Sequence, residues 1–159
     1  MTELVEPQPA ATDGVSIVEL PERRAAVVRI EGAVDELPRL MGGAFQATAG
    51  AIGAAGAQFA GPPFARYLAF GERIEAEVGF PFEGELSPAG DVFVCTLPHG
   101  RAVTTRHVGP YDGIGATWER ATEWMRARDL LASGPAWECY LTGPDEPGPP
   151  ITEVFWPVG

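Results

Sequence analysis

An acidic side chain and a phenol lie two residues apart in the short, mostly apolar segment 137–140, Trp-Glu-Cys-Tyr. Such a segment favours a β-strand, in which alternate side chains share a face, so we expect Glu138 and Tyr140 on the same face. If that face is buried, the Glu138 carboxylate needs a cation, a hydrogen-bond donor or a proton. It could then bind a cation or act as a general base. The alternative is a solvated glutamate on a half-exposed sheet.

The bulk composition indicates a soluble globular chain of one domain. The 159 residues carry a formal charge of −11, and all 11 basic residues are Arg. So acidic a chain lacks the basic face that phosphate contact requires, and it attracts cationic or neutral small molecules more readily than anions. We expect no nucleic-acid partner. No secretory signal opens the sequence and residues 41–61 lack the apolar density of a membrane span, so we expect a cytoplasmic protein without membrane contact.

The cysteines and histidines do not have the spacing of metal ligands. Cys95 and Cys139 lie in apolar runs and are interpreted as buried reduced thiols, although a disulfide stays open. His99 lies in a predicted turn and His107 in a predicted strand, with no ligand spacing around either. The sequence also contains no nucleotide-binding or serine-hydrolase motif. We therefore expect no metal and no cofactor.

The positions of Gly, Pro and apolar residues predict short elements. Residues 1–14 are polar and Pro-containing and are expected to form a disordered tail, followed by a single domain at 15–159. Two helices are expected, with Asp35 and Asp112 as their N-caps. Strands are predicted on both sides of Pro21, and in residues 64–70, 74–82, 91–98, 101–111, 137–141 and 151–158.

An internal repeat organises these elements. Residues 24–29, followed by Gly32 and Asp35, match residues 101–106, followed by Gly109 and Asp112, at a constant offset. Segments 64–68 and 77–81 match 137–141 and 153–157. The repeat predicts two β-α-β-β halves, at about 15–90 and 91–159. We expect an α+β fold with a mostly antiparallel sheet, two helices on one face and a central cleft where the halves meet.

The segment 101–112 (RAVTTRHVGPYD), Trp118, the strand at 137–141 with Gly143-Pro144 behind it, and the closing segment 152–157 together resemble the GyrI-like small-molecule-binding domain. This family includes the effector-binding domains of AraC- and MerR-type multidrug-sensing regulators. The resemblance covers about residues 15–159. It implies a pseudo-symmetric α+β fold with duplicated units of the SHS2 type and a central cleft. The cleft would hold an acidic residue, matching Glu138, and aromatic walls.

Several aromatic residues are candidates for those walls. Tyr140 shares the strand face of Glu138, and Tyr67 is its counterpart in the repeat, where Ala65 replaces Glu138. The remaining candidates are Tyr111, Trp118 and Phe155. For each, the alternative is a packing role in the core or in a turn. Trp156 is expected in the core on the helix side, because it alternates with Phe155.

Aromatic walls and one carboxylate suit a flat, hydrophobic, neutral or cationic ligand. The leading hypothesis is a stand-alone small-molecule-binding protein that senses or sequesters drugs. The first alternative, implied by the resemblance, is a metal-independent hydrolase of strained electrophiles such as cyclopropanoids, with Glu138 and Tyr140 as catalytic residues. The second is an inhibitor that binds a larger protein partner.

Overall fold

The computed structural model describes residues 14–142 and 146–158, so almost all of the predicted tail and the Gly143-Pro144 pair lie outside the described residues. No helix in these ranges is long and apolar enough to cross a membrane. The strands and α-helices, in chain order, are β2 (Ser16–Leu20), β3 (Arg23–Gly32), α1 (Leu37–Ala55), β4 (Gln58–Phe59), β5 (Phe64–Ala69), β6 (Ile74–Glu83), β7 (Val92–Leu97), β8 (Gly100–Val108), α2 (Ile114–Ala127), β9 (Trp137–Tyr140) and β10 (Ile151–Pro157).

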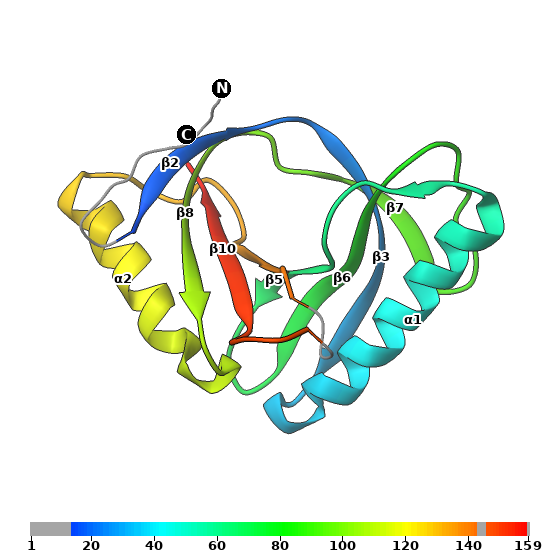
Figure 1. The fold of residues 1–159 in the computed structure, drawn as a ribbon, viewed down its shortest axis with the longest axis horizontal. Helices are drawn as coiled ribbons and strands as arrows, with labels where there is room; N and C mark the ends of the chain where they lie inside the picture. Colours follow the sequence, from blue (N-terminus) through cyan, green and yellow to red (C-terminus); the bar gives the residue numbers. More distant parts are fainter. Residues whose placement is uncertain (1–13, 143–145, 159) are drawn as a thin grey trace. The chain divides into compact units, whose positions relative to one another are not determined.

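The chain divides into two compact units, of which the first contains the described residues 14–21, 99–142 and 146–158. Its strands pair antiparallel in the order β2-β8-β10-β9, and α2 packs on β8 (Figure 1). Its core cluster joins the sheet to the helix through Val15, Val103, Met125 and Val158. Trp156 packs against this cluster, as its predicted position on the helix side requires.

The second unit contains residues 22–98. Its strands pair antiparallel in the order β5-β6-β3-β7, and the short β4 also pairs with β6. Helix α1 packs on β3 and β6 (Figure 1). Ala26, Ile52, Phe82 and Val92 form the core cluster between that helix and the sheet.

The predicted α+β fold and its duplication are confirmed. Apart from the short β4, the order strand, 3₁₀ turn, helix, strand, strand occurs once as β3, η1 (Val34–Glu36), α1, β5 and β6, and again as β8, η2 (Tyr111–Gly113), α2, β9 and β10. In both copies the last strand pairs with the other two strands: β6 pairs with β3 and β5, and β10 pairs with β8 and β9. The offset between repeated segments in the sequence therefore corresponds to a repeated pairing scheme.

The two units differ from the halves expected at about 15–90 and 91–159, because two strands are exchanged. β2 precedes β3 in the chain but pairs with β8, and β7 precedes β8 but pairs with β3. The chain passes from one unit to the other at Pro21–Glu22 and at Pro98–His99. Each crossing follows a proline, which has no N–H to donate to a strand ladder.

The two helices begin differently from the prediction. Asp35 and Asp112 are not N-caps but lie inside the 3₁₀ turns η1 and η2, and α1 and α2 begin only after those turns. At the first turn Glu36 provides the side-chain contact, because its carboxylate accepts the Ala33 N–H at 2.8 Å. The acidic residues still lie near the helix N-termini, where the helix dipole favours them.

Neither Cys95 nor Cys139 forms a disulfide; Cys139 is buried and Cys95 is half-buried. Burial raises the pKa of Cys95 from 9.0 to about 11, and the nearby negative charge of Glu77 adds to the rise. Because the thiolate is the reactive form, iodoacetamide should modify Cys95 at pH 8 roughly a hundredfold more slowly than an unperturbed thiol. Peptide mass spectrometry of a time course, with a model thiol as reference, measures this ratio. Labelling of the folded protein as fast as the model thiol would contradict the prediction.

Candidate functional site

Glu138 lies on β9 with only 1% of its surface exposed. It pairs across the sheet with Val154 of β10, which in turn pairs with Thr105 of β8. Val103, Thr105 and Glu138 therefore share one sheet face, and Val103 packs against Met125 of α2. The carboxylate thus points from the sheet toward the helix layer of the first unit, where a charge needs specific partners.

Three side chains of the first unit donate hydrogen bonds to this carboxylate. The Tyr111 hydroxyl donates to Oε1 at 2.5 Å, and the Tyr140 hydroxyl donates to the same oxygen at 2.9 Å. The Trp118 indole N–H donates to Oε2 at 2.8 Å. Hydrogen bonds to a charged acceptor are shorter and stronger than neutral ones, and each of these stabilises the ionised carboxylate. The three donors are themselves uncharged.

The donors are aromatic rings that remain partly exposed around the buried charge. Tyr111 is 45% exposed, whereas Trp118 and Tyr140 are half-buried. The Tyr111 and Tyr140 rings lie 6.2 Å apart with a 58° tilt, and Trp118 makes an edge-on contact with Trp156 at 5.4 Å. The first unit therefore combines aromatic surface with a negative charge behind it.

The structure brings together four of the six predicted site residues: Glu138, Tyr140, Tyr111 and Trp118. Phe155 lies on the opposite face of the sheet and stacks on Trp137, with ring centres 5.1 Å apart. The register explains this placement, because Val154, not Phe155, stands opposite Glu138. The sixth residue, Tyr67, belongs to the second unit.

In the second unit Tyr67 lies on β5, where its ring contacts Phe70 edge-on at 5.5 Å. Its equivalence to Tyr140 in the repeat gives both the same place in a strand, but the position equivalent to Glu138 is the buried Ala65. The second unit thus has the repeated phenol without the carboxylate. Within the described residues, no group of three or more His, Cys, Asp or Glu side chains could hold a metal ion.

His107 is not among the predicted site residues, but it contacts the turn that carries Tyr111. Its ring contacts Thr117 of α2 and the carbonyl oxygen of Pro110, directly before Tyr111. One sequence feature points to this contact: His107 and Tyr111 flank Gly109-Pro110, so both lie at the same strand-to-helix turn.

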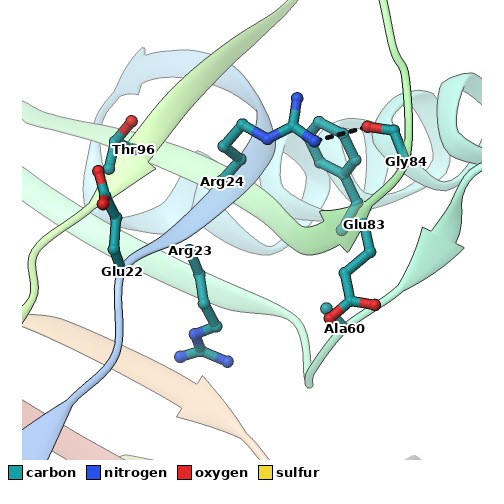
Figure 2. Close-up of a pocket in the computed structure, with 8 residues that line it drawn as sticks. Glu22, Arg23, Arg24, Ala60, Glu83, Gly84 and Thr96 are labelled. Carbon is teal, nitrogen blue, oxygen red and sulfur yellow. Dashed lines mark hydrogen bonds between the residues drawn. The ribbon is translucent and has the colours of Figure 1, made fainter.

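A separate pocket of about 420 Å³ lies within the second unit (Figure 2). Arg24 extends over it, with its guanidinium 4.8 Å from the Phe82 ring centre and donating to the Gly84 carbonyl oxygen at 2.6 Å. Glu22 and Glu83 also line the pocket. None of the predicted site residues contributes to its lining, so the pocket is distinct from the cluster around Glu138.

Structural comparison finds the same fold in several solved proteins. The C-terminal domain of EcmrR matches with a TM-score of 0.79 and 19% identity, over 91% of this chain and 96% of that one. In the EcmrR–DNA complex the same match spans 56% of the EcmrR chain. A hydrolase from Listeria innocua matches with a TM-score of 0.66 and 16% identity, over 94% of both chains.

SAV2435, solved with bound tetraphenylphosphonium, matches with a TM-score of 0.66 and 11% identity, over 91% of this chain and 93% of that one. A comparison with curated proteins gives no match. The sequence model of the GyrI-like small molecule binding domain matches residues 63–159, more than half of the chain. Together with the duplicated α+β fold, this match shows that the chain belongs to the GyrI-like small-molecule-binding domain family.

Proposed function

We propose that the chain binds flat, hydrophobic, neutral or cationic small molecules at the cluster formed by Glu138, Tyr111, Trp118 and Tyr140, and so senses or sequesters them. The observation that carries this proposal is the buried carboxylate held by three uncharged donors beside partly exposed rings. These three donors are neutral, so none of them brings a positive charge to the carboxylate. A cationic ligand therefore gains attraction from Glu138 in addition to contact with the rings.

Two interactions with the site contribute favourable binding free energy for a cationic ligand. A cation over a tyrosine or tryptophan ring gains roughly 0.5–2 kcal/mol, depending on its desolvation. A unit charge about 4 Å from a carboxylate gains up to about 4 kcal/mol at the effective dielectric constant of a protein surface. A neutral aromatic ligand receives only the ring contacts, so cationic ligands should be preferred.

Proteins with the same fold support a cationic aromatic ligand for this proposal. SAV2435 was solved with tetraphenylphosphonium, a cation surrounded by four aromatic rings. EcmrR was solved bound to DNA, and this chain spans about half of that protein. Drug sensing is therefore proposed for this chain from the likeness of its domain, and sequestration fits the same binding site equally well.

Titration with tetraphenylphosphonium tests the proposal directly. Trp118 belongs to the site, so we expect saturable quenching or enhancement of tryptophan fluorescence, with calorimetry as an independent measurement. The matched neutral probe is triphenylphosphine oxide, which should bind at least tenfold more weakly. Failure of tetraphenylphosphonium and of a panel of cationic aromatic dyes to bind at millimolar concentration would refute the proposal.

A second candidate function is hydrolysis of strained electrophiles such as cyclopropanoids. The observation that favours it is the placement of two phenolic hydroxyls on one carboxylate oxygen, at 2.5 and 2.9 Å. Glu138 would accept a proton from the attacking water, while a tyrosine hydroxyl would donate to the developing anion. Turnover of a cyclopropane-bearing electrophile that is lost in both Glu138→Gln and Tyr140→Phe would support it. A rate equal to that of buffer would remove this candidate.

A further inference from the structure

His107 joins three parts of the first unit that meet beside the Glu138 cluster. It lies on β8, in a cross-strand row with Thr152 of β10 and Tyr140 of β9. Its Nδ1 is 2.9 Å from the Thr117 hydroxyl on α2. Its Nε2 is 2.7 Å from the carbonyl oxygen of Pro110. The ring therefore connects the sheet, the helix and the turn between them.

The carbonyl partner fixes the direction of one of the two hydrogen bonds. A carbonyl oxygen only accepts, so Nε2 must carry a proton and donate it to Pro110. In the neutral ring Nδ1 is then an acceptor, and the Thr117 hydroxyl donates to it. Thr117 is 3% exposed, which makes this hydroxyl a fixed partner on the helix.

The Pro110 contact acts on the backbone that carries Tyr111. The same carbonyl oxygen also accepts the Gly113 N–H at 3.1 Å, so two donors hold it. Gly113 leaves room for the ring, because a Cβ added there would lie 3.3 Å from Cε1 of His107. The next residue, Tyr111, is 45% exposed and lies in a three-residue 3₁₀ turn. The imidazole and the Gly113 N–H both hold the carbonyl oxygen at the start of this turn.

We propose that His107 is a positioning residue for ligand binding: by holding the Pro110 carbonyl it keeps the Tyr111 hydroxyl on Glu138 and the Tyr111 ring at the ligand surface. The effect of His107 on ligand binding rests on the proposed function. The dependence of the Tyr111–Glu138 hydrogen bond on His107 does not, and it can be measured without any ligand.

Two substitutions separate the two ring nitrogens. The amide nitrogen of Gln reaches the position of Nε2, so His107→Gln can still donate to Pro110. The amide of Asn reaches only the position of Nδ1, so His107→Asn can contact Thr117 but releases the Pro110 carbonyl. We expect His107→Asn to weaken tetraphenylphosphonium binding about fivefold to tenfold, as for the loss of one hydrogen bond. His107→Gln should stay within about twofold of the parent.

Thr117→Val provides the matched control, because it removes the other contact of the ring and leaves Pro110 held. It should also bind within about twofold of the parent. Equal losses of affinity in His107→Asn and His107→Gln, at equal thermal stability, would overturn the inference, since a merely structural imidazole would be damaged by both changes.

The ligand-free measurement uses tyrosine labelled with ¹³C at the ring carbon that bears the hydroxyl. The Tyr111 signal is assigned by its absence in Tyr111→Phe. It should shift or broaden in His107→Asn and remain at the parent position in His107→Gln. An unchanged Tyr111 signal in His107→Asn would also overturn the inference. If this NMR pattern is found but the parent binds no cation, the proposed function fails while the positioning role of His107 stands.

Discussion

Glu138→Gln should weaken the binding of tetraphenylphosphonium about 10- to 100-fold, which corresponds to about 1.4–2.8 kcal/mol. The substitution removes the charge and keeps the shape of the side chain. It should change the affinity for triphenylphosphine oxide by less than about threefold, because a neutral ligand gains no Coulomb energy from the carboxylate. Isothermal titration calorimetry of both ligands with both proteins measures the difference.

The Gln variant should fold, because its amide can be accommodated by the three donors. The indole N–H of Trp118 cannot accept, so the Gln carbonyl oxygen takes the place of Oε2. The amide nitrogen then faces the hydroxyls of Tyr111 and Tyr140, which can accept as well as donate. A small loss of thermal stability is expected from the weaker, uncharged hydrogen bonds.

Glu153→Gln is the matched control for net charge. Glu153 lies on β10 beside Cys139, on the sheet face opposite Glu138, and forms an ion pair with Arg106 at 3.1 Å. Its partner Arg106 is 60% exposed, so solvent screens the pair and its contribution to stability is small. Equal weakening of cation binding by Glu153→Gln and Glu138→Gln would show that the general acidity of the chain, not the site, attracts the ligand.

Gly79→Ala should lower the free energy of unfolding by about 3 kcal/mol, or the melting temperature by about 6–12 °C. Gly79 lies on β6 opposite Val27 of β3 and Phe64 of β5, so strands flank it on both sides. A Cβ at this position would lie 1.8 Å from the carbonyl oxygen of Ala26 and 2.9 Å from Cα of Val27. Both obstacles are backbone atoms, so only a shift of a strand can relieve the overlap.

Gly53→Ala provides the same chemical change without the overlap. Gly53 is an exposed residue of α1, and nothing lies within 4 Å of a Cβ added there. Alanine is the better helix former by about 0.8–1.0 kcal/mol, so this variant should be as stable as the parent or more stable. Thermal unfolding followed by circular dichroism compares both variants. A melting temperature of Gly79→Ala within 2 °C of the parent would contradict the close strand approach.

Sequence reasoning recovered the elements and their duplication because both depend on local or repeated patterns. Apolar alternation located the strands, and the offset between 24–29 and 101–106 related the two copies. The same alternation placed Glu138 and Tyr140 on one face, where the Tyr140 hydroxyl does contact the carboxylate. Contacts within one strand follow from its period of two.

Contacts between different strands and helices were harder to predict from the sequence. Phe155 was grouped with Glu138, but the register of β9 and β10 places it on the opposite face beside Trp137. A shift of one residue between two strands reverses the faces, and nothing in either strand specifies that register alone. The contacts of Tyr111 and Trp118 with Glu138 likewise depend on how α2 packs, although family resemblance made both residues candidates.

The exchange of β2 and β7 also has a consequence for biosynthesis. Residues 22–98 form a continuous unit, so β3, β5, β6 and β7 can pair with one another as soon as they leave the ribosome. β2 is made earlier but cannot pair until β8 follows, since Leu20 pairs with Gly100, 80 positions later. At about 5–20 residues per second, roughly 4–16 s separate these two events. β2 must therefore remain without its partner strand while residues 22–98 are made and begin to pair.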